Sequence, residues 1–97
     1  MRVIARKTLS DFYGSHVESK SALESWFHEV VSASWREPND IKRRYPSADI
    51  LQDNRVVFNI KGNTYRLIVK IHYNTGIVFI RFIGTHAEYD RVDATRI

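Results

Sequence analysis

Apolar residues in the first half of the chain recur at the spacing of an α-helix. The strongest repeat returns every three to four positions and comprises Ala22/Leu23, Trp26/Phe27 and Val30/Val31. Ser21 and Glu24 have the spacing of a capping box, so we expect this helix to begin there. Its large aromatic side chains need a broad apolar surface to cover, and only a sheet in the second half of the chain can supply one.

Two shorter elements precede this helix. Val3 and Ile4 lie among cationic residues and predict a short strand. A weaker helical repeat follows and predicts a first helix with Thr8 or Ser10 as its N-cap. We expect this first helix to end near His16.

A basic segment lies between residues 35 and 46. Pro38 falls where a helix would have its first turn, and Ile41 and Tyr45 would share one side of that helix. The pattern indicates a short helix or turn whose other side is cationic, with the residues Lys42, Arg43 and Arg44.

In the second half of the chain the hydrophobic period changes from helical to alternating. Apolar residues occupy every second position before and after Gly62-Asn63, which predicts a β-hairpin with strands over Val56–Ile60 and Tyr65–Ile71. A second turn at residues 73–76 leads into a third strand, Ile77–Ile83. We therefore predict an α+β fold in which two N-terminal helices pack on one face of a small antiparallel sheet. The polar residues 85–97 predict a turn with a short helical or extended end.

The first hairpin assigns side chains to the two faces of the sheet. A two-residue loop at Gly62-Asn63 pairs Asn59 with Arg66 and Val57 with Ile68. One face then receives only apolar residues and can meet the main helix: Val56, Phe58, Ile60, Tyr65, Leu67, Val69 and Ile71. The face without helices receives Asn59, Lys61, Arg66 and Lys70.

The face of Arg81 depends on the length of the second turn. A three-residue loop would bury this arginine in the apolar core, whereas a four-residue loop places it beside Ile68 on the open face. We choose the four-residue loop, which also turns Val78, Ile80 and Phe82 inward. The open face would then gather four cations that suit a bent phosphate backbone: Lys61, Arg66, Lys70 and Arg81.

Composition narrows the class of protein. A chain of 97 residues can enclose one modest core, so we expect residues 1–97 to form a single domain. The absence of cysteine excludes disulfides, cysteine-based zinc sites and thiol catalysis. The net charge of +4 suits a partner rich in phosphate, and Arg43 and Arg44 are further candidate contacts for it.

Other signals are missing from the sequence. No histidine, aspartate and glutamate residues have metal-ligand spacing, and we expect neither a metal nor another cofactor. The longest apolar run, Ile77–Ile80, is too short to cross a membrane, and the opening residues lack the apolar core of a signal peptide. We therefore expect a cytoplasmic protein.

Titratable groups follow the last predicted strand, in the segment Gly84–Asp90. His86 can exchange protons near neutral pH, and Tyr89 can stack on a base or bind a phosphate. Their position beside the cationic face makes both of them candidates for the functional site. We interpret the remaining His16 and His72 as structural or surface residues.

Two segments together resemble the HigB toxin family. Residues 58–67 read FNIKGNTYRL and contain the Gly-Asn-x-x-Arg-Leu hairpin of that family, and residues 85–90 read THAEYD, similar to its closing Thr-His-x-Glu-Tyr-Asp. The resemblance extends over essentially the whole chain. It implies the fold of RelE-like toxins, in which two N-terminal helices pack against an antiparallel sheet and RNA lies on the other face.

The resemblance also implies an activity and a partner. HigB toxins are ribosome-dependent mRNA endonucleases (mRNA interferases), checked by an antitoxin, usually HigA, that carries a helix-turn-helix domain. Such enzymes need no metal, because the 2′-hydroxyl attacks the adjacent phosphate. The implied roles are phosphate stabilisation by Arg66 and Lys61, acid or base catalysis by His86, and stacking on or positioning of a base by Tyr89, with Lys70 and Arg81 as supporting cations. The face assignment and the basic segment add Asn59, Arg43 and Arg44 as candidate RNA-binding residues.

Two other functions fit the same sequence features. A non-catalytic RNA- or DNA-binding module could use the basic sheet without any group for proton transfer. A ParE-like toxin with a similar fold would poison gyrase and damage DNA while leaving mRNA intact.

Overall fold

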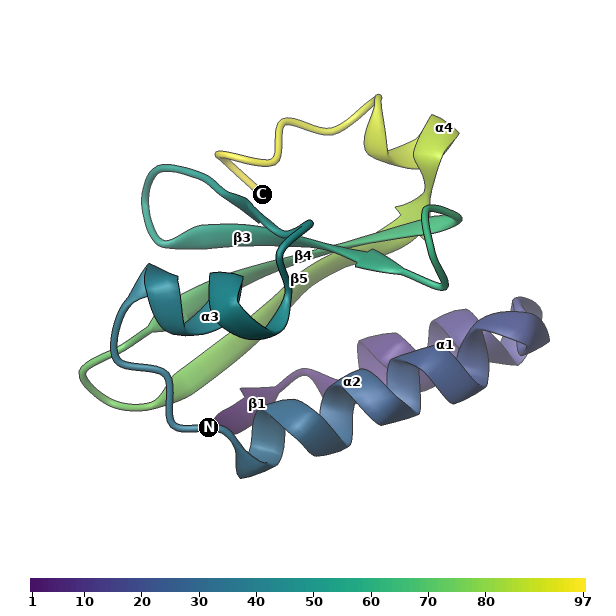
Figure 1. Cartoon of the computed structure of the whole chain (residues 1–97). Coiled ribbons are helices and arrows are strands. Elements are labelled where there is room, and N and C mark those ends of the chain that lie inside the picture. The colour runs from purple at the N-terminus through teal and green to yellow at the C-terminus, as the bar shows by residue number, and fades with distance from the viewer.

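A five-stranded mixed sheet forms the middle layer of the molecule (Figure 1). The computed structural model describes all residues 1–97, and the strands lie in the order β1-β5-β4-β3-β2. Their bounds are β1 Arg2–Ile4, β2 Asp49–Ile50, β3 Arg55–Ile60, β4 Tyr65–His72 and β5 Ile77–Thr85. The central strands are antiparallel as expected, but β1 pairs parallel with β5, and β2 was not anticipated from the sequence.

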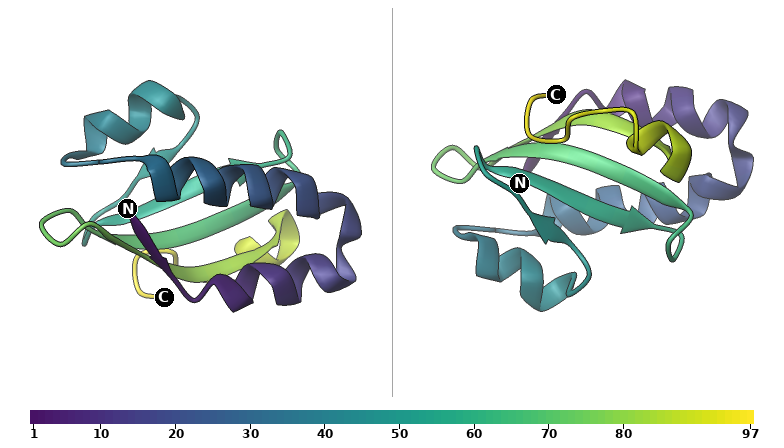
Figure 2. Two further views of the ribbon diagram at one scale, coloured as in Figure 1. Left: turned by 90° about the horizontal axis from the view of Figure 1, so that it is seen from below. Right: turned by 90° about the horizontal axis from the view of Figure 1, so that it is seen from above.

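Helices lie on both faces of the sheet, and most of them lie on one face (Figure 2). One face carries α1 Arg6–Ser15, α2 Lys20–Ser32 and α3 Pro38–Arg44, with a 3₁₀ turn, Val17–Ser19, between α1 and α2. The other face carries only α4, His86–Tyr89, and the segment that follows it (Figure 1). The predicted α+β class is therefore confirmed. No helix is long and apolar enough to cross a membrane.

Aromatic packing around Phe58 joins the helices to the sheet. The Phe58 ring centroid lies 5.4 Å from that of Trp26 in α2, 6.1 Å from Trp35 and 5.1 Å from Tyr45. Every residue predicted for the apolar face of the hairpin belongs to this buried cluster: Val56, Phe58, Ile60, Tyr65, Leu67, Val69 and Ile71. The period-two pattern therefore located the core correctly.

The helix starts differ from those that the sequence indicated. α1 begins at Arg6, after Ala5 in the left-handed region at φ 72°, and not after Thr8 or Ser10. α2 begins at Lys20, so the predicted capping box of Ser21 and Glu24 is wrong. The 3₁₀ turn Val17–Ser19 leads directly into α2.

Local interactions define the starts of α2 and α3. In the 3₁₀ turn the hydroxyl of the buried Ser19 donates to the His16 carbonyl at 2.7 Å, and this bond fixes how the chain enters α2. α3 follows the prediction, because Pro38 is its first residue. A reciprocal capping box of Glu37 and Asp40 completes its first turn.

The strand register confirms the first hairpin and modifies the second. Asn59 pairs with Arg66 and Val57 with Ile68, as predicted. The second turn has the expected four residues between His72 and Ile77, but a β-bulge follows it, so that Phe82 pairs with Ile68. The expectation that Phe82 points inward is therefore wrong, because the extra residue in the bulge, Arg81, reverses the alternation beyond it.

The face of the sheet opposite α1, α2 and α3 is partly covered. Val57 and Ile68 point away from the aromatic core, yet both are fully buried. The segment after α4 crosses this face, and it ends where Arg55 Nε and Nη2 donate to the Ile97 carbonyl at 3.0 and 2.9 Å (Figure 2). Only part of the predicted open face is therefore accessible.

Replacing Phe58 with alanine should test the aromatic core. Phe58 is 1% exposed and contacts three aromatic rings, so we expect Phe58→Ala to lower the free energy of unfolding by about 3–5 kcal/mol. Urea unfolding followed by circular dichroism would measure this change. The control is Val31→Ala on the exposed side of α2, which should change the free energy of unfolding by less than about 0.5 kcal/mol. Similar values for both variants would contradict the proposed core.

Candidate functional site

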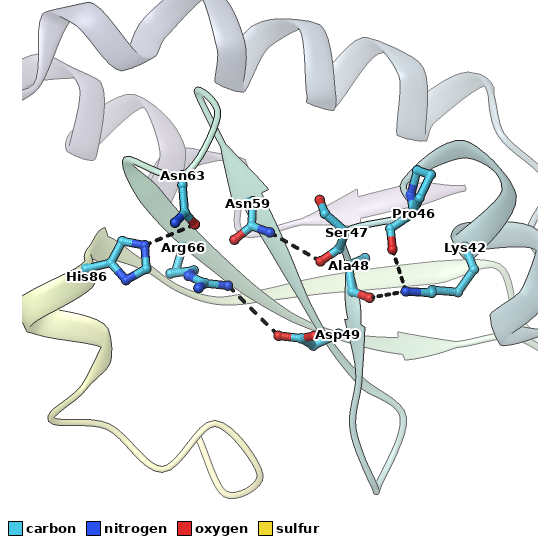
Figure 3. Close-up of polar contacts among 9 residues, drawn as sticks. All are labelled: Lys42, Pro46, Ser47, Ala48, Asp49, Asn59, Asn63, Arg66 and His86. Atoms are coloured by element: carbon cyan, nitrogen blue, oxygen red, sulfur yellow. Dashed lines mark hydrogen bonds and ion pairs between the residues drawn. The ribbon is translucent and has the colours of Figure 1, made fainter.

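Arg66 lies at the centre of the polar groups on the less covered face. It occupies β4 between its strand neighbours Asn59 and Gly84, and its side chain is only 18% exposed. The guanidinium carbon lies 5.4 Å from the centre of the Tyr89 ring, and Nη1 lies 3.9 Å from Asp49 Oδ2 (Figure 3). The guanidinium is thus located between α4 and the short strand β2.

Gly84 allows α4 to approach this arginine. Gly84 is buried and pairs with Arg66 across the sheet. A Cβ atom at this position would lie 2.6 Å from Phe82 Cζ and 3.1 Å from Glu88 Cβ, and both distances are too short for undisturbed contacts. Because glycine has no side chain, the first turn of α4 can pack directly on the end of β5.

A capping box holds α4 in place. Thr85 Oγ1 accepts a hydrogen bond from the Glu88 amide at 3.2 Å, and Glu88 Oε1 accepts one from the Thr85 amide at 2.8 Å. The bond from the Thr85 amide is the main reason why the pKa of Glu88 lies below its ordinary value. These two bonds set the start of the helix that carries His86 and Tyr89.

His86 points toward the loop of the first hairpin. Its Nε2 lies 3.2 Å from Asn63 Oδ1 (Figure 3). The sequence pattern predicts only a turn at Asn63, because its contact with His86 depends on α4 folding back beside this loop. The structure therefore brings three predicted site residues to one end of the sheet: Arg66, His86 and Tyr89.

Two more predicted cations lie on the same face but farther along the strands. Lys70 pairs with Phe79 in β5 and with Arg55 in β3. Arg81 is exposed at the β-bulge, and its guanidinium carbon lies 5.8 Å from the centre of the Phe79 ring. Arg66 and Arg81 are thus both outside the helical layer, as predicted, but they contact different aromatic rings.

Lys61 is not placed beside Arg66. Its backbone has φ 54°, in the left-handed region, which ends the alternation of β3. Lys61 lines a pocket of about 250 Å³ together with Ala22 and Ser25 of α2. It also lies near Glu18, whose pKa is lowered mainly by the donated hydrogen bond of the Tyr65 hydroxyl and to a smaller extent by Lys61. The expectation that Lys61 shares the face of Arg66 is therefore wrong.

Arg43 and Arg44 lie on α3, in the layer of long helices, and are already paired. Arg43 Nη1 lies 3.0 Å from Asp40, and Arg44 forms an ion pair with Glu29 of α2. The Tyr45 hydroxyl also donates to Glu29, and burial together with this bond raises the pKa of Tyr45. The structure does not bring these two arginines together with Arg66.

Two residues that pair directly across the sheet each have a polar atom without a partner. Asn59 Nδ2 donates to the Ser47 carbonyl at 3.2 Å, but Asn59 Oδ1 is buried without a hydrogen bond (Figure 3). The Nε atom of its strand partner Arg66 is also buried and unpaired. Nowhere in the chain do three or more histidine, cysteine, aspartate or glutamate residues form a group that could hold a metal ion.

Sequence comparison identifies the family. A family model described as HigB_toxin, the RelE-like toxic component of a toxin–antitoxin system, matches residues 19–92. The chain belongs to the HigB toxin family. This confirms the resemblance seen in residues 58–67 and 85–90, and the matched range includes every candidate site residue.

Individual members of the HigB family resemble the chain over nearly its whole length. The mRNA interferase toxin HigB of Escherichia coli K12 is 28% identical over 92 residues, covering 93% of this chain and 88% of the relative. The mRNA interferase HigB of Shigella flexneri gives the same identity and coverage. That of Escherichia coli O6:H1, strain CFT073, is 22% identical over 94 residues, covering 95% and 91%.

The capping box of α4 predicts how the site responds to acid. Because the pKa of Glu88 is lowered from 4.5 in the folded protein, its carboxylate stabilises α4 above pH 4.5. This contribution is lost as the pH falls through the lowered value. We therefore expect hydrogen exchange at the amides of residues 86–89 to accelerate in acid, relative to the intrinsic rate, and the Glu88→Gln variant to show a smaller change.

A threonine variant separates the helix cap from the charge. Thr85→Val removes the acceptor for the Glu88 amide, so we expect α4 to lose about 1 kcal/mol of stability at neutral pH. The control is Thr64→Val in the hairpin loop, where the threonine is exposed. Equal exchange rates at Glu88 in both variants would show that the cap does not hold α4.

Proposed function

We propose that this protein is a ribosome-dependent mRNA endonuclease that cleaves RNA without a metal ion. The main support is the contact of Arg66 with the Tyr89 ring, at the end of the sheet where α4 also carries His86. The relatives named mRNA interferase support the same reading, because they resemble the chain over nearly its whole length. As a member of a toxin family, the protein would act by stopping translation.

In the proposed reaction the site must stabilise charge, transfer a proton and position a base. The 2′-oxygen forms a bond to the adjacent phosphorus, the bond from phosphorus to the 5′-oxygen breaks, and a proton moves from the first oxygen to the second. Negative charge grows on the phosphate oxygens, and Arg66 would stabilise it through two parallel hydrogen bonds. His86, oriented by Asn63, would be the acid or base, and Tyr89 would stack on a base.

The remaining candidates would contact RNA away from the reacting phosphate. Lys70 and Arg81 lie farther along the same face and suit neighbouring phosphates. Lys61 suits an RNA strand that passes over the end of β3, and it is therefore a weaker candidate for the reacting phosphate than Arg66. Arg43 and Arg44 would first have to leave Asp40 and Glu29.

The proposal includes a partner and a place of action. The family description as the toxic component of a toxin–antitoxin system supports a cognate antitoxin. We propose a HigA-type protein with a helix-turn-helix domain in that role. Cleavage of mRNA on the ribosome would take place in the cytoplasm, and the net charge of +4 favours approach to this polyanionic particle.

Expression in bacteria tests the proposed function directly. The protein induced alone should arrest growth, and primer extension should reveal new mRNA 5′ ends inside translated regions. Growth arrest with unbroken mRNA and damaged DNA would instead favour a gyrase poison. RNA binding without any cleavage would favour a binding module.

Arg66→Ala should abolish toxicity without unfolding the protein. The loss of a donor to the developing charge should slow cleavage by about 100-fold or more in a translating extract. Circular dichroism should still show a folded domain, because Arg66 lies outside the aromatic core. Lys7→Ala removes the same charge from an exposed position on α1 and should leave cleavage unchanged. Unfolding of Arg66→Ala would contradict the placement of this residue.

His86→Ala should separate cleavage from binding. Removal of a general acid or base should lower the cleavage rate by about 100- to 10,000-fold while RNA affinity stays near that of the wild type. His28→Ala on the exposed side of α2 is the matched control and should cleave normally. Full cleavage by His86→Ala would remove this histidine from the mechanism.

A further inference from the structure

We infer that two residues near Arg66 control how its guanidinium binds RNA. Asn59 offers an acceptor to the inner part of the side chain, and Asp49 lies at the outer end that a phosphate must reach. Asp49 therefore competes with the RNA for Arg66. This inference rests on the proposed function, because it takes the RNA phosphate to be the ligand of Arg66.

The geometry of Asn59 makes it a positioning residue. Its amide nitrogen donates to the Ser47 carbonyl, so its Oδ1 is fixed on the other side of the amide group (Figure 3). Asn59 and Arg66 are direct partners in the antiparallel pair of β3 and β4, where opposite side chains lie close enough to interact. Asn59 Oδ1 is a buried acceptor without a donor, and Arg66 Nε is a buried donor without an acceptor. A hydrogen bond between Arg66 Nε and Asn59 Oδ1 would satisfy both atoms.

Burial of Nε restricts the way in which RNA can bind. Because solvent does not reach this atom, a phosphate can approach only the two terminal nitrogens of Arg66. Asp49 Oδ2 lies 3.9 Å from one of them, Nη1, so the carboxylate faces the same end of the guanidinium. An RNA phosphate that binds both terminal nitrogens must displace Asp49.

Asp49 can be displaced at low cost. It lies on β2, a strand of only two residues at the edge of the sheet, and its side chain is 59% exposed. The distance of 3.9 Å is too long for a direct hydrogen bond. The carboxylate nevertheless keeps a negative charge where the phosphate has to bind, and this charge opposes RNA binding.

Neutralising Asp49 should therefore tighten RNA binding. The probe is a short RNA oligonucleotide with methylated 2′-hydroxyls, which the protein cannot cleave, and fluorescence anisotropy gives its affinity. We expect Asp49→Asn to bind it about two- to fivefold more tightly than the wild type, the usual range for an exposed ion pair. Asp11→Asn makes the same change of charge on α1, where Asp11 pairs with Lys7, and should bind like the wild type. Equal tightening in both variants, or weaker binding by Asp49→Asn, would overturn the inference.

A double-mutant cycle shows whether Asp49 acts through Arg66. In an Arg66→Gln background, the Asp49→Asn substitution should no longer change RNA affinity, because its competitor role requires the guanidinium. A gain that persists without Arg66 would mean that Asp49 repels RNA on its own, and the competition would then be refuted.

The positioning role of Asn59 is tested by a measurement that a purely structural role would not change. Asn59→Leu removes the acceptor at similar volume, so the Nε proton of Arg66 should exchange faster with solvent in NMR spectra. Cleavage in a translating extract should then show a lower kcat with little change in KM. Unchanged exchange of the Nε proton would contradict the positioning role.

The outcomes also distinguish this inference from the proposed function. If the wild-type protein neither binds nor cleaves RNA, both fail together. If it binds and cleaves RNA but Asp49→Asn behaves like Asp11→Asn, only the competition between Asp49 and phosphate fails.

Discussion

The packing of β3 and β4 on the aromatic side chains of α2 and of the residues that flank α3 constrains the rest of the structure. Side chains alternate along a strand, so burying Tyr65 and Leu67 in this core forces Arg66 between them to the opposite face. A shift of one residue in the register would bury the arginine and expose both apolar neighbours. The energy that fixes the core therefore also fixes the direction of the candidate phosphate-binding side chain, although Arg66 contributes little to the core.

The opposite face becomes a localised site because the chain returns over it. The segment after α4 covers Val57 and Ile68 and ends at Arg55, so the middle of this face is closed. The end near Gly84 remains, where α4 packs on β5 and contributes a histidine and a tyrosine. RNA recognition suits such a shallow, cationic and aromatic surface, because a phosphate backbone needs exposed donors and a base needs a flat ring.

Local patterns in the sequence were sufficient for the core and for the first hairpin, and insufficient where distant segments meet. The pairing of Asn59 with Arg66 followed from the Gly62-Asn63 turn and the period-two pattern. The parallel pairing of β1, the two-residue strand β2 and the bulge at Arg81 depend on contacts between segments far apart in the chain. Asp49 was missed for this reason, since a two-residue strand has no period to detect. His86 and Tyr89 became candidates through their chemistry and through the resemblance to HigB toxins.

Two departures from ordinary local structure belong to the pair of β3 and β4. Asn59 Oδ1 and Arg66 Nε, on residues that pair directly across these strands, are both buried without a partner. A buried polar atom without a partner costs about 1–3 kcal/mol, so selection for stability alone would remove it. The accessible end of Arg66 is also incompletely paired, because Asp49 Oδ2 lies 3.9 Å from Nη1, and a fully satisfied guanidinium would gain less from a phosphate. The fold thus accepts a local loss of stability at the residue whose terminal nitrogens the proposed chemistry uses.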